Sequence, residues 1–142
     1  VMEECDADKM LAEMIRVAKP GGRVAVMVRA TDRRSLWNMP LNDTVREIVE
    51  TPVTSVGVGG CADVSLYSRF GKSGLIDLRL FPTTMTVTDP ESYSWRYYEP
   101  YIFSLLDEAG ISQWQDAKAA AIKDGSIMMA RWMHCAVGTK PQ

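Results

Sequence analysis

The chain has 142 residues, 46% of them hydrophobic and 24% charged, which is the size and composition of one soluble globular domain. Its 16 basic and 18 acidic residues leave a net charge of −2, which argues against a general binder of nucleic acid or anionic membranes. No apolar run approaches the roughly 20 residues that a membrane-spanning helix needs. The three cysteines are odd in number and widely spaced, so we expect reduced, packing cysteines in a cytoplasmic protein (Cys5, Cys61 and Cys135).

The stretch Asp6–Ala30 predicts a helix, a tight turn and a strand. Apolar residues recur on one helical face from Met10 to Ala18, and Asp6 or Asp8 can cap the first turn. The helix should end at Lys19-Pro20-Gly21-Gly22, because proline cannot continue it and glycine suits the turn. The strand 23–30 is apolar throughout its centre, which is typical of a strand covered on both faces in the middle of an α/β sheet.

A second helix is expected before Pro52, with Thr31-Asp32 as a possible cap and an apolar face from Leu41 to Glu50. The run that follows has the dinucleotide-binding spacing G-x-G-x-x-A at Gly57, Gly59 and Ala62, with Asp77 about 20 residues further on. The short, polar segment before this run is a poor strand. We therefore favour a flexible glycine-rich loop that leads into a helix over residues 62–72.

Residues 75–81 and 83–88 predict a half-exposed edge strand with a bend at Pro82, and Ile76, Leu78 and Leu80 form its apolar face. Asp89 should cap the next helix, with Pro90 in its first position. The aromatic run that begins this helix fits either a ligand pocket or aromatic core packing (Tyr93, Trp95, Tyr97 and Tyr98).

Beyond Pro100 the apolar pattern resumes and ends at Gly110, a further helix is expected over 112–123, and the last strand over 127–137. His134 is the only histidine and lies within this last strand. A metal site or a Ser-His-Asp triad is therefore disfavoured, and we expect a structural or surface role for His134.

Three stretches together resemble the C-terminal half of a class I S-adenosylmethionine-dependent methyltransferase. Met10–Val26 looks like that family's helix, proline-glycine turn and fifth strand. Tyr67–Asp77 looks like the helix, small-residue turn and entry to the sixth strand. Residues 119–126 through Gly138-Thr139-Lys140-Pro141 are similar to the last helix and the seventh strand.

The resemblance implies an α/β fold: half of a Rossmann-like sheet in the order five, seven, six, with the last strand antiparallel and helices on its flanks. It implies S-adenosylmethionine as cofactor, held in the family by a glycine-rich loop and an acidic residue that would lie upstream of Val1. We therefore expect residues 1–142 to be a single, partial domain that lacks the cofactor-binding half and is inactive alone. The run Gly57–Ala62 is not that loop, since it follows the fifth strand. No catalytic, cofactor-binding or metal residue is carried over.

The segments after the fifth and sixth strands would arch over the carboxyl edge of the sheet, where ligands bind in open α/β folds. We expect Arg29, Trp37, Trp95 and Tyr98 to wall a small-molecule substrate site there. The strand 23–30 would lack a neighbour on one edge, so we expect a homodimer through this strand or the adjacent helices. The alternatives are a non-catalytic dimerisation or interaction module and, with less support, a dinucleotide-binding domain.

Overall fold

The computed structural model describes all residues from Val1 to Gln142, and the chain divides into two compact units. The first, here called the sheet unit, comprises Val1–Arg33, Pro52–Thr84 and Trp132–Gln142. The second, the helical unit, comprises Arg34–Thr51 and Met85–Arg131. The fold is mixed α/β, with five helices and a four-stranded antiparallel sheet. No helix is long and apolar enough to cross a membrane.

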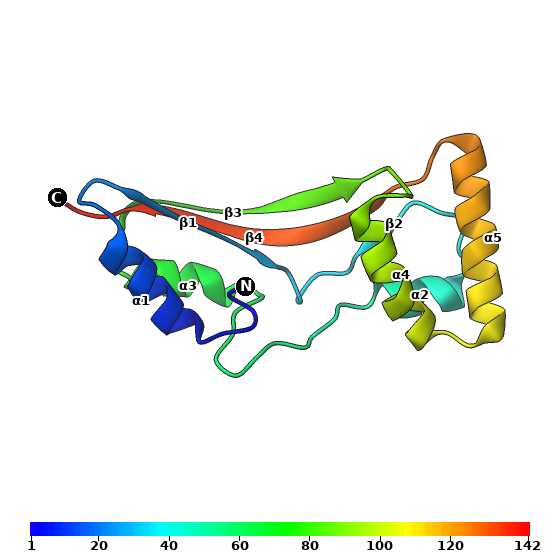
Figure 1. The fold of residues 1–142 in the computed structure, drawn as a ribbon, viewed down its shortest axis with the longest axis horizontal. Coiled ribbons are helices and arrows are strands. Elements are labelled where there is room, and N and C mark those ends of the chain that lie inside the picture. Colours follow the sequence, from blue (N-terminus) through cyan, green and yellow to red (C-terminus); the bar gives the residue numbers. More distant parts are fainter. The chain divides into compact units, whose positions relative to one another are not determined.

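The sheet unit is organised by β4 (Met129–Thr139), most of which lies in this unit. It pairs antiparallel with β1 (Arg23–Arg29), in a register that places Val28 opposite His134. It also pairs with β3 (Ile76–Val87). Helices α1 (Ala7–Val17) and α3 (Ser65–Lys72) cover the same face of these strands, as Figure 1 shows.

The predicted helix, turn and strand at the start of the chain are confirmed. The Asp6 side chain caps α1 by accepting a hydrogen bond from the Lys9 N–H. Gly21 has a positive φ of 74°, which glycine adopts without strain. The Gly21 N–H donates to the Lys140 carbonyl and the Lys140 N–H donates to the Gly22 carbonyl, so the turn is joined to the end of β4.

The prediction that β1 is covered on both faces is wrong. Its side chains alternate between buried and exposed, and Met27 is 59% exposed. The buried side chains Val24, Val26 and Val28 pack with Leu11 of α1 and with α3, and these two helices cover one face only. The apolar sequence of β1 is therefore compatible with helices on one face of the strand and solvent on the other.

The strand β3 is confirmed as an edge strand, because it pairs with β4 alone. It runs through Pro82 from Ile76 to Val87, so the bend expected there does not interrupt the strand. Proline has no N–H to donate, and an edge strand tolerates that loss on its unpaired side. The predicted apolar face is also more open than expected, since Ile76 is 49% exposed.

The helical unit contains α2 (Asp43–Glu50), α4 (Tyr93–Leu105) and α5 (Glu108–Asp124). A short strand, β2 (Leu36–Trp37), pairs with Met129 and Ala130 at the start of β4. These three helices and β2 enclose a core that is rich in tryptophan (Trp37, Trp95 and Trp114).

Several predicted helix ends in this unit are wrong. The cap of α2 is Asn42, not Thr31-Asp32, because its side chain accepts from the Val45 N–H. Ser92 caps α4 in the same way, whereas the Asp89 carboxylate accepts from Glu91 in the preceding turn.

Two expected breaks do not occur. Helix α4 continues through Pro100, and Gly110 lies in the first turn of α5, where its N–H is capped by Asp107. The end of α5 is marked by Gly125, at φ 75°.

Candidate functional site

A chain of three hydrogen-bonded side chains lies inside the sheet unit. The hydroxyl of Tyr67, on α3, is 2.9 Å from Nδ1 of His134, on β4. Nε2 of the same imidazole is 2.8 Å from Oδ1 of Asp32, which follows β1. The His134 side chain is only 3% exposed and that of Asp32 is 31% exposed, so the imidazole is buried while the carboxylate is partly open to solvent.

Backbone hydrogen bonds hold Asp32 in place. The Ala30 N–H donates to the Trp132 carbonyl, which extends the pairing of β1 with β4 by one residue. Both the N–H and the hydroxyl of Thr31 donate to the Ala62 carbonyl, at 2.7 and 2.8 Å. The chain is thus fixed at the two residues that immediately precede Asp32.

The chemistry of the three groups sets the direction of the hydrogen bonds. A carboxylate can only accept, so Nε2 of His134 donates to Asp32. Burial raises the pKa of Tyr67, with smaller contributions from Cys135 and Asp32, and so favours its protonated form. With a neutral imidazole, the Tyr67 O–H donates to Nδ1, and the phenol oxygen keeps its lone pairs available to a further donor.

A cavity of about 320 Å³ opens beside this hydrogen-bonded chain. Six residues of the sheet unit line it, namely Arg33, Val64, Tyr67, Pro82, Trp132 and His134. They come from the segment after β1, from α3 and its entry, from β3 and from β4. The cavity therefore lies at the carboxyl end of β1. Its volume is at the lower end of the range for small-molecule sites, which starts at about 300 Å³.

Two larger cavities lack such a group of side chains. One, of about 440 Å³, lies between α1 and α3, where Arg69 is ion-paired with Asp8. The other, of about 480 Å³, lies beside α2 and the start of α5, where Asp107 is used as a helix cap. The first contains an ion pair and the second a helix cap, but neither contains a histidine bonded to both an acid and a phenol, so the cavity beside His134 is the better candidate.

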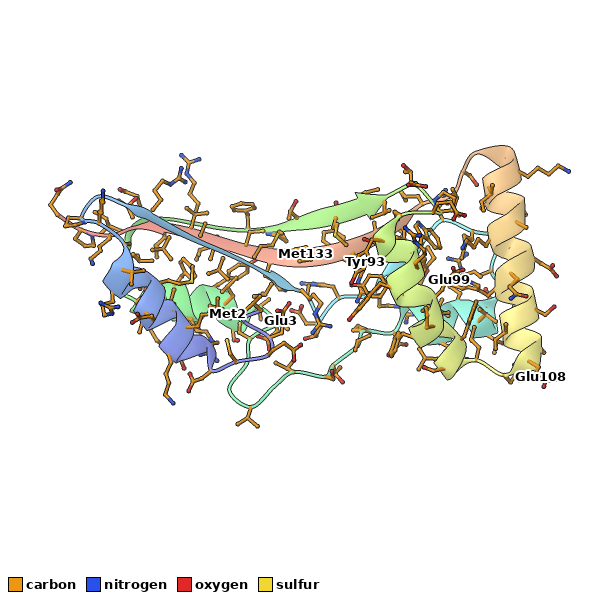
Figure 2. The ribbon with its side chains drawn as sticks, viewed as in Figure 1. Met2, Glu3, Tyr93, Glu99, Glu108 and Met133 are labelled. Atoms are coloured by element: carbon orange, nitrogen blue, oxygen red, sulfur yellow. The ribbon has the colours of Figure 1, made fainter.

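Arg29, one of the predicted substrate residues, is ion-paired with Glu3. Its Nε lies 3.3 Å from the Glu3 carboxylate, and its backbone N–H donates to the same oxygen at 3.2 Å. Burial acts to raise the pKa of Glu3, but hydrogen bonds from the N-terminal ammonium and from backbone N–H groups of Glu3 and Arg29 lower it to about 2. Met2 and Glu3, which precede α1, are labelled in Figure 2.

The other three predicted residues come together in the helical unit. Trp37 and Trp95 are fully buried and meet edge to face, with ring centroids 5.2 Å apart. Tyr98 packs against the same core and carries the Arg131 guanidinium over its ring at 4.1 Å. The indole N–H of Trp95 has no hydrogen-bond partner. Their role in a substrate wall stays a prediction.

The partnership of His134 with Tyr67 and Asp32 was not predicted from the sequence. These residues are separated by 67 and 102 positions, respectively, from His134, and no local motif links them. The available signal was a single histidine in a strand whose neighbours are apolar, together with an acidic residue just after β1. That signal indicates a buried, partnered histidine but not its partners.

The glycine-rich run does not fit a dinucleotide or an S-adenosylmethionine cofactor. The Gly57 N–H donates to the Glu3 carbonyl and the Gly60 N–H to the Gly57 carbonyl, so these amides are already satisfied within the chain. A Cβ at Gly60 would collide with the Glu3 carbonyl oxygen, which explains this glycine by packing. The element immediately before the run is the helix α2, so no strand leads directly into it as the dinucleotide motif requires.

No protein-family model and no curated protein matches the chain. Two solved structures of Haemonchus contortus phosphoethanolamine N-methyltransferase 2 are similar to it. One, with phosphomonomethylethanolamine and S-adenosylhomocysteine, is 18% identical and aligns with 100% of this chain and 32% of that chain at a TM-score of 0.41. The other, with S-adenosyl-L-methionine, is 19% identical and aligns with 99% and 31%, respectively, at 0.40. The chain thus spans about a third of the length of these proteins.

Proposed function

We propose that this chain forms the substrate-side portion of an S-adenosylmethionine-dependent methyltransferase. One observation carries the proposal: the last strand, β4, runs antiparallel to the strand that follows the Lys19-Pro20-Gly21-Gly22 turn. The resemblance in sequence implies this pairing of the fifth and seventh strands, and the pairing of β4 with β3 supports the implied order five, seven, six.

The substrate side is favoured over the cofactor side because the glycine-rich run has the amides of Gly57, Gly60 and Cys61 occupied within the chain. The cavity at the carboxyl end of β1 supports a small-molecule ligand, since this is where open α/β sheets bind ligands. Arg29, Trp37, Trp95 and Tyr98 stay proposed wall residues. The two buried tryptophans would have to move to meet a ligand.

Titration calorimetry of this chain with S-adenosylmethionine, S-adenosylhomocysteine and NAD in parallel tests the proposal. We expect no saturable heat with any of the three, because the chain presents no free glycine cradle. Binding of the first two would place a complete cofactor site in this chain and correct the substrate-side assignment. Binding of NAD alone would contradict the methyltransferase proposal and favour the dinucleotide alternative.

We also propose a homodimer, in which a second copy pairs with the free edge of β1. The N–H groups of residues 24, 26, 28 and 30 point toward β4, as the Ala30 bond to Trp132 indicates. Those of Ala25 and Met27 therefore point to the open edge, while the Arg29 N–H is covered by Glu3. An antiparallel pairing centred on Ala25 would satisfy this edge and place Arg23 opposite Met27, with no arginine facing another.

Light scattering tests this dimer. We expect a dimer at tens of micromolar for the unchanged chain and a monomer for Ala25→Pro, because proline removes a donor that only the second copy would use. Ala25→Ser keeps the donor and serves as the matched control. A dimer that persists in folded Ala25→Pro would move the interface to the helices, and a monomeric unchanged chain would contradict the dimer itself. The dimer alone would not distinguish a methyltransferase portion from an interaction module.

A further inference from the structure

We propose that the cavity beside Asp32, His134 and Tyr67 binds a small hydroxylated aromatic molecule and accepts the proton of its hydroxyl group. The inference concerns proton transfer within the sheet unit and does not depend on whether a methyl group is later transferred. It rests on the walls of the cavity, on the direction of its hydrogen bonds and on the charges around it.

The walls suit a flat, apolar ring. Val64, Pro82 and Trp132 supply most of the lining, and Trp132 is 42% exposed, so part of its indole is open to contact. Aromatic rings pack well against indole and proline faces, and a volume of about 320 Å³ accommodates one or two rings.

The polar end of the cavity offers an acceptor to the ligand. The Tyr67 proton is directed to Nδ1 of His134 at 2.9 Å, so the phenol oxygen receives a hydrogen bond from the ligand. A hydroxyl group on the ring satisfies that oxygen, whereas a purely apolar ring would leave it without a partner.

The transfer balances without any further reactant. The ligand O–H bond breaks and its proton passes to the Tyr67 oxygen, while the Tyr67 proton passes to Nδ1 of His134. The products are a ligand phenolate and an imidazolium, and the imidazolium is held by the Asp32 carboxylate at 2.8 Å. A ring hydroxyl that is more acidic than the Tyr67 phenol can give up this proton to the imidazole, whereas an aliphatic alcohol is too weak an acid.

The charges nearby support the ionised products. Arg33 lines the cavity, and its positive charge acts to lower the pKa of Tyr67. The same charge would stabilise a ligand phenolate that lies beside the Tyr67 oxygen. Asp32 balances the charge on His134, and Asp63 also interacts with that imidazole. The remaining group close to Tyr67 is the Cys135 thiol, whose pKa is raised by burial and which therefore stays neutral.

The probe for the experiment is 4-nitrophenol, whose phenolate absorbs at longer wavelength than its neutral form. It is titrated with the chain at a pH below its own pKa, where the free probe is mostly neutral. We expect saturable growth of the phenolate band on binding. Tyr67→Phe should lower the bound phenolate fraction by about tenfold or more, the effect of losing one hydrogen bond to a charged group.

Asp32→Asn should lower the band as well, because the imidazolium loses its carboxylate while the shape of the side chain is kept. Tyr101→Phe, at a partly exposed tyrosine of the helical unit, is the matched control and should leave the band unchanged. Circular dichroism verifies that each variant is folded. Failure of the unchanged chain to bind the probe, binding without a phenolate band, or a full band in folded Tyr67→Phe would overturn the proposal.

Discussion

The two units bury different kinds of side chain. The sheet unit has a mainly aliphatic core, yet it contains both of the buried polar or charged residues, Glu3 and His134. The helical unit buries no such residue and instead stacks three tryptophans edge to face or tilted. Buried polar groups are costly unless they are paired, so the unit that contains them is the better place to seek chemistry. Packing accounts for the three tryptophans of the helical unit, whereas Tyr93 and Tyr97 of α4 are exposed.

The largest expected effect is on the tryptophan core. Trp114 is fully buried, and its indole N–H donates to Glu99, which lies on α4 (Figure 2) and is ion-paired with Lys118 of α5. Trp114→Ala should cost about 3–5 kcal/mol in the free energy of unfolding, measured by denaturant titration, since it leaves a large cavity.

The matched control for that loss is Trp132→Ala, at the partly exposed tryptophan of the sheet unit. We expect a much smaller cost for it, because water already reaches the ring. Equal losses for the two variants would contradict the packing role assigned to the helical unit.

The next effect concerns the buried carboxylate of the sheet unit. The pKa of Glu3 is about 2 in the folded chain, against an ordinary value of 4.5. Between these pH values the unfolded chain binds more protons than the native one. The contribution of the Glu3 carboxylate to the free energy of unfolding is therefore fully present above pH 4.5 and is lost as the pH falls toward 2.

Glu3→Gln should accordingly lower stability at neutral pH and flatten its decline on acidification, as followed by thermal unfolding across that range. Glu4→Gln is the control, because the Glu4 side chain is largely exposed and lies 3.8 Å from Arg29. If the stability of Glu3→Gln still falls steeply on acidification, other carboxylates and not Glu3 cause that fall.

The smallest expected effects on the free energy of unfolding come from replacing one glycine in each unit. Gly125 ends α5 with a φ of 75°, so Gly125→Ala should cost about 1–2 kcal/mol. Gly71 lies within α3 with an ordinary φ, and no atom lies within 4 Å of the position that a Cβ would take there. Gly71→Ala should therefore stabilise by about 0.5–1 kcal/mol. Chemical denaturation measures both, and the same sign for both would contradict these backbone assignments.

Local signals predicted α1, a cap at Asp6 or Asp8 and the turn that leads into β1, because each depends on residues close together in the chain. Helix ends in the helical unit were harder. Pro100 and Gly110 favour a break locally, but burial of Ile102 and Trp114 in the shared core keeps both residues helical. Tertiary packing overrides local preference at such points.

The candidate site depends on contacts that no local pattern contains. Asp32 reaches His134 only because β1 and β4 pair in one register and because Thr31 is held by Ala62. Tyr67 lies in the helix that was predicted over residues 62–72, but nothing near it in the sequence indicates a partner for its hydroxyl. The sequence indicated which strand carries the histidine, and the fold supplied its partners.

The most direct test of the site uses the fact that His134 is the only histidine. Nitrogen-15 NMR of the imidazole in the folded chain reports which nitrogen carries the proton. We expect a proton on Nε2, hydrogen-bonded to Asp32, and an unprotonated Nδ1 that accepts from Tyr67, with the Nδ1 signal shifted in Tyr67→Phe. A neutral imidazole protonated on Nδ1, or a signal that Tyr67→Phe does not move, would contradict the proposed proton acceptor.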